Sequence, residues 1–153
     1  MNKKVLEVGS QDINGNNNYL FENCDMLRVD LGAGPNVDLV CHGADLNHED
    51  SSYDVIISTE AFEHDSRFEE TLKNIIRLLK PSGFFVFTCA SAGRGEHGTH
   101  NFSGGCSPHT LDFYENRTEE DVRNILNLDE IFNQYEFKED LTSHDLYFYG
   151  IKK

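Results

Sequence analysis

The sequence predicts an α/β three-layer sandwich with a mostly parallel sheet and a C-terminal antiparallel hairpin, in one domain that covers residues 1–153. Three observations predict this fold. Short apolar runs alternate with loops and one helix-period segment over residues 4–90, which is the order of a parallel sheet. Two further strand-like runs, separated by a polar turn, end the chain. The 153 residues, 38% of them hydrophobic, suffice for one packed core.

Four strands are expected in the first part of the chain. Their apolar runs are bounded by Gly, Asn and Asp, which are typical of turns. The first run stops at Gly9, the second ends on Asp30, and the fourth is rich in β-branched residues, as in a central strand. The four runs cover residues 4–8, 26–29, 37–41 and 53–58.

A helix and a fifth strand follow. Between residues 68 and 79 the apolar residues recur every three or four positions, which predicts a helix with one buried face. Pro81 and Gly83 then indicate that the helix stops. Residues 84–89 are apolar on alternate and intervening positions alike, which is typical of a strand covered on both faces.

The last part begins with a long loop. Residues 90–116 are rich in Gly, His and Ser, and loops of this length in compact domains are often functional lids. Thr118 and Asp121 form a capping-box pattern that opens a short helix through Leu126. Residues 135–138 and 146–151 are the expected strands of the closing hairpin.

Charge and composition exclude several functions. A formal net charge of −14 repels phosphate backbones, so nucleic acid is a poor candidate partner and a small molecule is favoured. No apolar stretch approaches the ~20 residues of a membrane span, and a strand starts too early for a signal peptide. Four scattered cysteines fit a reduced, cytoplasmic protein.

Polar residues follow four of the predicted strands, where ligands of parallel sheets bind. The first group is the loop from Glu7 through Gly9 to Gly15, and the second is Asp30, whose carboxylate can accept hydrogen bonds from both hydroxyls of a ribose. Asp45 follows the third strand, and residues 58–64 follow the fourth. Taken singly, the aspartates and glycines are equally typical of turns.

The glycine loop does not have the chemistry of a phosphate-binding loop. It lacks both the Walker pattern and the complete G-x-G-x-x-G of dinucleotide folds. Glu7 would repel a pyrophosphate, whereas a ligand with a cationic amine and a sulfonium would suit it. The loop therefore favours a positively charged nucleoside over a nucleotide.

The order VLEVGSQDING, RVDLGAGPNVDLV, HGADL, YDVIISTEAFEH and LLKPSGFFVFT resembles the type-11 branch of class I S-adenosylmethionine-dependent methyltransferases, over residues 4 to about 126. Similar members also carry His-Gly-Thr and Ser-Pro…Tyr-x-Asn-x-Thr-x-x-Asp, found here at residues 97–99 and 107–121. The resemblance implies a Rossmann-like fold, S-adenosylmethionine as cofactor and methyl transfer as activity. The glycine loop departs from the branch pattern, with Gln11 and Ile13 where later glycines often fall, and the sequence shows no N-terminal helix of the kind many members fold over the cofactor.

The resemblance also implies residue roles. Glu7 and Gly9 would face the methionine part of the cofactor, with the loop from Ser10 to Gly15 closing over it. Asp30 would hold the ribose hydroxyls. The remaining expected contacts are Leu31, Asp45 and Leu46 at the adenine, and Ser58, Thr59 and Glu60 on the floor between cofactor and acceptor.

Histidines supply the candidate catalytic groups, and no metal ligand is assigned. His64 or His97 would take a proton from the acceptor. His64 could equally be a helix-start residue bonded to Glu63 or to backbone. The spacing of His97, His100, Cys106 and His109 is compatible with tetrahedral zinc, but without a CxxC pair a glycine-rich lid is the preferred interpretation.

Three functions stay open at this point. The leading one is a methyltransferase that acts on an unidentified acceptor. The second is a non-catalytic cofactor-binding subunit that needs a protein partner, and a homodimer is equally open. The third is a nicotinamide-dependent oxidoreductase.

Overall fold

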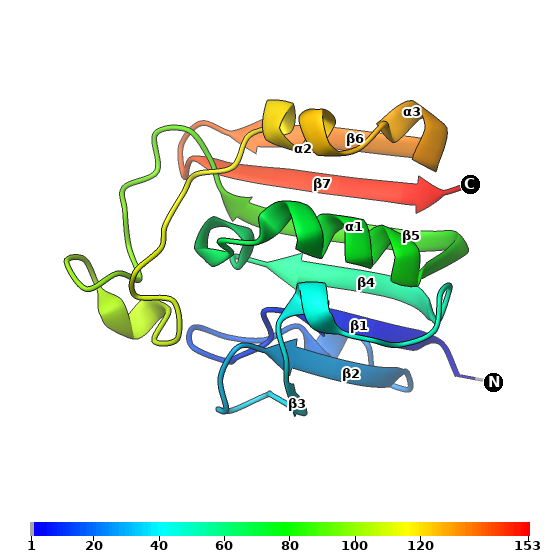
Figure 1. Ribbon diagram of the computed structural model, residues 1–153, viewed down its shortest axis with the longest axis horizontal. Helices are drawn as coiled ribbons and strands as arrows, with labels where there is room; N and C mark the ends of the chain where they lie inside the picture. The colour runs from blue at the N-terminus through cyan, green and yellow to red at the C-terminus, as the bar shows by residue number, and fades with distance from the viewer. Residues whose placement is uncertain (1) are drawn as a thin grey trace.

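The computed structural model describes residues 2–153, which form a seven-stranded sheet in the order β3-β2-β1-β4-β5-β7-β6 (Figure 1). The strands from β1 to β5 pair in parallel, and β7 is antiparallel to both β5 and β6. The α/β class, the mostly parallel sheet and the C-terminal antiparallel hairpin are thus confirmed. The strands are β1 (Lys4–Val8), β2 (Asp25–Asp30), β3 (Leu39–Val40), β4 (Tyr53–Thr59), β5 (Leu79–Ala90), β6 (Phe132–Asp140) and β7 (Asp145–Lys152).

The α-helices of the described residues all cover one face of the sheet (Figure 1). They are α1 (Phe68–Leu78), α2 (Glu119–Ile125) and α3 (Leu128–Ile131), and none of them is long and apolar enough to cross a membrane. Four 3-10 turns complete the elements: η1 (Asn18–Leu20), η2 (Gly43–Asp45), η3 (Phe62–His64) and η4 (Gly104–Cys106).

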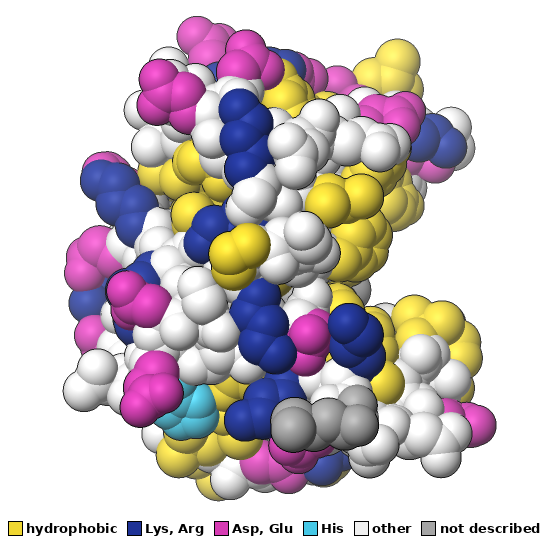
Figure 2. Space-filling view, turned by 90° about the vertical axis from the view of Figure 1, so that its right-hand side faces the viewer, with side chains coloured by type: hydrophobic (Ala, Val, Ile, Leu, Met, Phe, Trp, Pro, Cys, Tyr) yellow, Lys and Arg dark blue, Asp and Glu magenta, His cyan; other side chains and the backbone are white. Residues whose placement is uncertain are grey.

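The opposite face carries the polar loop between β1 and β2, which includes η1 (Figure 1). The asparagines of this loop offer no apolar helical stripe, so the third layer of the expected sandwich is a loop here rather than helices. Part of that face stays open: Figure 2 shows hydrophobic side chains at the surface on this side, and Phe84 and Tyr147 are 37% and 39% exposed.

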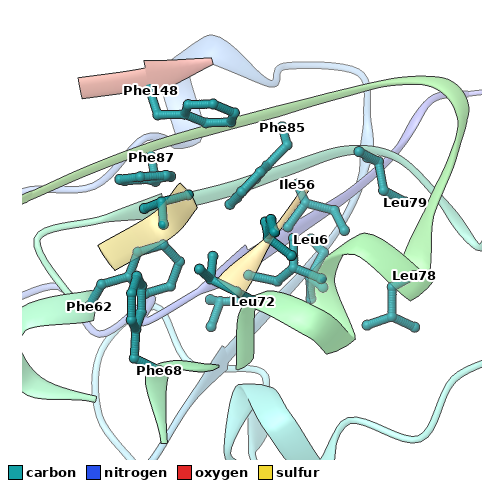
Figure 3. Packing of buried hydrophobic residues seen from close by; sticks show 14 of the residues in the cluster. Leu6, Ile56, Phe62, Phe68, Leu72, Leu78, Leu79, Phe85, Phe87 and Phe148 are labelled. Atoms are coloured by element: carbon teal, nitrogen blue, oxygen red, sulfur yellow. The ribbon is translucent and has the colours of Figure 1, made fainter. Parts of the chain in front are cut away.

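The core lies between α1 and the sheet (Figure 3). Phe68, Leu72 and Ile75 of α1 are buried, which confirms the apolar face expected between residues 68 and 79. They meet side chains that point to the same face of the sheet, such as Leu6 and Phe85. Each fully buried side chain of this size contributes about 1.5–3 kcal/mol, so this face fixes α1 and η3 over β4 and β5.

Element bounds differ from the expected ones where local geometry decides. The helix ends at Leu78 and β5 starts at Leu79, which is already extended, and Pro81 disfavours helical conformation for Lys80, the residue before it. β3 has two residues rather than five, with Val40 54% exposed at the sheet edge. The capping box of Thr118 and Asp121 is present at the start of α2 as predicted.

Asp54 ties the first strand to its neighbours. Its carboxylate accepts a 2.9 Å hydrogen bond from the backbone N–H of Lys4 and lies 2.9 Å from Nζ of Lys80. The Lys4 N–H, Lys80 and more distant Lys3 lower the pKa of Asp54 to about 2. Because the folded pKa lies below the unfolded value of about 3.9, the ionised group stabilises the fold above about pH 4, and this contribution is lost as the pH falls toward 2.

We therefore expect Asp54→Asn to lower the free energy of unfolding by about 1 kcal/mol at pH 7, after allowance for solvent screening. The difference from the unmodified chain should shrink toward zero between about pH 4 and 2. Urea unfolding at a series of pH values measures it, with the exposed Glu22→Gln as the matched control. A difference that persists unchanged to pH 2 would show that the carboxylate charge does not stabilise the β1 contact.

Candidate functional site

A cavity of about 800 Å³ opens at the carboxyl ends of β1, β2 and β4. In the sheet order, β1 continues to β2 on one side and is flanked by β4 on the other, so the cavity lies where the strand order reverses. This switch point is the usual ligand site of parallel sheets, and the volume falls within the ~300–1,000 Å³ of small-molecule sites. The long loop 90–116 extends beyond these strand ends (Figure 1) and contributes to the lining.

Glu7 lies at the inner wall of the cavity. It is 2% exposed, and its two oxygens accept hydrogen bonds from the side-chain amides of Asn17 at 2.8 Å and Asn36 at 3.4 Å. Burial raises the pKa of Glu7, and the two asparagine hydrogen bonds and the charge of Arg28 only partly oppose the rise. Because burial disfavours the charged form of this carboxylate, a cationic ligand group in front of it would be bound favourably.

The loop after β1 turns sharply along the cavity. Gly9 has φ +77°, and a Cβ at this position would lie 2.3 Å from Cβ of Ala61. Only glycine therefore allows the two strand ends to approach this closely. Ser10 is buried, its Oγ has no hydrogen-bond partner among residues 2–153, and it lines the cavity together with Gly15. The expected contacts of the glycine loop are thus gathered on one wall.

Asp30, the last residue of β2, and Leu31, which follows it, also line the cavity. Asp30 Oδ2 accepts a 2.9 Å hydrogen bond from the N–H of Gln11, which fixes the loop after β1 against the end of β2. Each carboxylate oxygen has further lone pairs, so the group can still accept hydrogen bonds from a ligand. Leu31 is 41% exposed and offers an apolar surface beside it.

Three expected contacts lie outside the cavity. The carboxylate of Asp45 is held by Arg67 at 2.7 and 2.9 Å, and Leu46 is buried in the core. Ser58 is fully buried and faces the α1 side, because alternate residues of a strand point to opposite faces and Thr59 takes the cavity side. These three side chains do not line the cavity, and the adenine and floor contacts expected of them stay predictions.

Thr59, Glu60 and His64 line the cavity at the end of β4. Glu60 has φ +50°, and its side chain accepts a 2.7 Å hydrogen bond from Thr88 Oγ1. His64 is 7% exposed, and burial, assisted by nearby His97, lowers its pKa to about 4. It is therefore neutral at physiological pH.

The loop expected as a lid, residues 90–116, lines part of the cavity. His97 and Cys106 line it, and the His109 ring packs so closely on Gly32 that a Cβ there would lie 2.1 Å from Nε2. Arg117 anchors the return of the loop, since its guanidinium donates to the carbonyls of Phe62 and Asp65 at 3.1 and 2.8 Å. The loop is thus tied to both the end of β2 and the turn η3.

The zinc pattern expected as an alternative is not assembled by the lid. His100 is exposed and does not line the cavity, and its Nε2 lies 3.2 Å from Oδ1 of Asp112. Within residues 2–153 the candidate metal ligands that converge are instead Glu63, His64 and His97.

Glu63 is the residue that sequence reasoning missed. It is completely buried behind His97, with 3.9 Å between Glu63 Oε1 and His97 Nε2. Burial and the charge of Glu60 raise its pKa to about 8, and the nearby backbone N–H groups of Glu63 and Ala90 offset this only in part. No local signal separates it from a surface glutamate, since the sequence places it in a polar segment after β4. Cys41, His42 and Arg94 are further lining residues with no sequence signal.

Comparison with known proteins places these features in context. A family model described as methyltransferase domain matches residues 8–87. A comparison with curated proteins found no match.

Several solved structures share the fold. The 1,6-didemethyltoxoflavin-N1-methyltransferase of Burkholderia thailandensis, bound to 1,6-didemethyltoxoflavin and S-adenosylhomocysteine, superposes with a TM-score of 0.68 at 18% identity, over 99% of this chain and 72% of that one. Phosphoethanolamine N-methyltransferase 2 of Haemonchus contortus superposes with a TM-score of 0.65 at 14% identity, over 99% of this chain and 49% of that one. A chain from a Haloferax volcanii complex between the Trm112 methyltransferase activator and a methyltransferase superposes with a TM-score of 0.64 at 19% identity, over 98% of this chain and 82% of that one.

Proposed function

The chain belongs to the methyltransferase-domain family of class I S-adenosylmethionine-dependent methyltransferases, and on that premise we propose that it methylates a small molecule bound at the His64–His97 end of the cavity. One observation carries the proposal. Glu7, Gly9 and Asp30 line the same cavity as the two histidines, of which His64 belongs to η3 and His97 to the loop 90–116. One space thus has room for a cofactor and a small acceptor.

The cofactor supplies an activated methyl group, so the protein mainly aligns the acceptor, the methyl carbon and the sulfur. Glu7 and the loop from Gly9 to Gly15 would hold the cationic methionine part. Asp30 would accept hydrogen bonds from the ribose, with Leu31 against the adenine. Thr59 and Glu60 would form the floor on the acceptor side.

A small acceptor is favoured over a nucleic acid by charge. The chain has a net charge of −14, and carboxylates of Glu7, Asp30, Glu60 and Asp65 line the cavity. A phosphate backbone would be repelled along this whole rim. Transfer of a labelled methyl group into separated fractions of metabolites, RNA and protein tests this. Label in the metabolite fraction supports the proposal, and label confined to RNA or protein contradicts it.

An acceptor hydroxyl or ammonium must lose a proton, and we propose that His64 and His97 promote this loss. Once an acceptor is known, His64→Ala and His97→Ala should each reduce turnover by about 100-fold or more, with cofactor affinity unchanged. His100→Ala is the matched control, because His100 lies on the same loop outside the cavity. Unchanged turnover in both variants would exclude the histidines from catalysis.

A cofactor-binding subunit that works only with a partner is the second candidate function. The open sheet face with Phe84 and Tyr147 favours it, and the Haloferax neighbour is a complex with an activator. Activity that requires a second chain, or a homodimer, would distinguish this case from a self-sufficient enzyme.

A further inference from the structure

We propose that Glu63, His64 and His97 bind a divalent transition-metal cation in the wall of the cavity. Glu63 and His64 belong to η3, and His97 comes from the loop 90–116. One candidate ligand atom from each residue lies within 4.8 Å of those of the other two. Two imidazoles and one carboxylate are a ligand set that zinc and non-haem iron sites use.

Glu63 is the first of three independent signs. It is 0% exposed, and neither of its carboxylate oxygens has an aligned hydrogen-bond partner within residues 2–153. A buried carboxyl group without partners is costly, and buried charges are normally paired or coordinate metals. A cation between Glu63 and the histidines would satisfy both oxygens.

The second sign is the orientation of His97. Its Nδ1 lies 3.0 Å from the carbonyl oxygen of Gly95, so a proton on Nδ1 is donated to this oxygen. The lone pair is then on Nε2, which faces Glu63 Oε1 at 3.9 Å. Metal-bound histidines are typically oriented in this way by a backbone carbonyl on the other ring nitrogen.

The third sign is how His64 is held. Its Nδ1 is buried and has no hydrogen-bond partner in the part of the chain that the structure describes, and the centroid of its ring lies 5.1 Å from that of His97. Tyr114 packs edge-on against both rings, with centroid distances of 5.5 and 4.9 Å. Gly98 has φ +65°, and a Cβ there would lie 2.6 Å from His64 Cε1, so the loop is built to press against this ring. Both imidazoles are thus fixed in place.

The spacing permits coordination with small movements. Ligand atoms around tetrahedral zinc are about 3.4 Å apart, so the three side chains need to draw together by about 1 Å. His64 and His97 both line the cavity, whereas Glu63 lies behind them. Three protein ligands would therefore leave a coordination position open toward the acceptor.

The role of the ion in transfer rests on the proposed function, although the binding itself does not. An acceptor hydroxyl bound at the open position would lose its proton to solvent more readily. Its oxygen would then form a bond to the methyl carbon, while the carbon–sulfur bond breaks and its electron pair goes to sulfur. The histidines would promote proton loss as ligands in this arrangement rather than as free bases.

Calorimetric titration of the chelator-treated full chain with Zn²⁺ tests the site, together with the visible spectrum of the Co²⁺ form. We expect one ion per chain at micromolar affinity or tighter, and a cobalt spectrum without a thiolate charge-transfer band. Glu63→Gln and the partly exposed His97→Asn should each weaken binding by more than about tenfold, and His100→Ala should not. Circular dichroism confirms that each variant is folded.

The proposal is overturned if Zn²⁺ does not bind, or if Glu63→Gln and His97→Asn both bind it as tightly as the unmodified chain. It is also overturned by a thiolate band that places the ion on a cysteine such as Cys106. Titration with S-adenosylmethionine in the presence of a chelator separates the two claims. If the chain binds the cofactor but no metal, the methyltransferase proposal stands and the metal site is excluded. If the chain binds the metal but no cofactor, the metal site stands and the methyltransferase proposal is contradicted.

Discussion

Gly9→Ala is expected to lower the free energy of unfolding by at least about 2 kcal/mol and to abolish cofactor binding. The added methyl group would have to occupy space 2.3 Å from Cβ of Ala61, at a residue with φ +77°. Relief of that contact must separate the loop after β1 from the end of β4. At this chain length the melting temperature should fall by roughly 4–8 °C, as thermal unfolding will measure.

Gly105→Ala is the matched control for this substitution. Gly105 lies in the loop 90–116, has no atom within 4 Å of a built Cβ and does not line the cavity. We expect it to melt within about 1 °C of the unmodified chain and to bind the cofactor normally. If Gly9→Ala behaved like this control, the close approach of the two strand ends would not be required for the site.

Asp30→Ala is expected to weaken S-adenosylmethionine binding by about 100-fold or more. The substitution would remove the proposed hydrogen bonds from two ribose hydroxyls to the carboxylate, and each bond to a charged group is worth about 1.5–3 kcal/mol. The variant also loses the 2.9 Å hydrogen bond from Gln11 that holds the loop after β1. Calorimetry gives the affinity, and the melting temperature shows whether the fold itself is affected.

Asp25→Ala provides the comparison, because Asp25 is an exposed aspartate at the opposite end of the same strand β2. It should leave cofactor affinity within about twofold. Equal affinity in Asp30→Ala and Asp25→Ala would mean that the ribose contact is made elsewhere. The cavity would then need a different ligand orientation.

Local patterns were sufficient for the elements whose cause is local. The apolar face of α1 and the capping box at Thr118 each depend on residues a few positions apart. The sequence also predicted that Asp30 lies at the ligand-binding edge of the sheet, and Asp30 does line the cavity there. The prediction was possible because the carboxyl ends of parallel strands meet at the same edge of a sheet.

Long-range contacts and strand parity decide why some of the expected site residues lie outside the cavity lining. Asp45 is held by Arg67, which is 22 positions away and belongs to a different element. Ser58 points into the core because successive residues of a strand alternate between the two faces, and it shares its face with the fully buried Ile56. The position of a polar residue after a predicted strand shows neither the Arg67 contact nor the face of the sheet to which Ser58 points.

The Glu63–His97 contact is the clearest case of this kind. The two residues are joined only when the loop 90–116 returns over η3, where Arg117 anchors it to the carbonyl of Phe62. The sequence identified His64 as a candidate base after β4 and gave Glu63 only the role of a possible hydrogen-bond partner of His64. Burial of Glu63, which gives it chemical interest, is a property of the folded loop alone.

The most direct test of a functioning cofactor site is calorimetric titration of the unmodified chain with S-adenosylmethionine and, separately, with S-adenosylhomocysteine. We predict one site per chain and micromolar affinity for both ligands, with binding that Asp30→Ala loses. Absence of binding at millimolar ligand would contradict it, and would mean that the loop from Gly9 to Gly15 does not hold the cofactor in this chain alone.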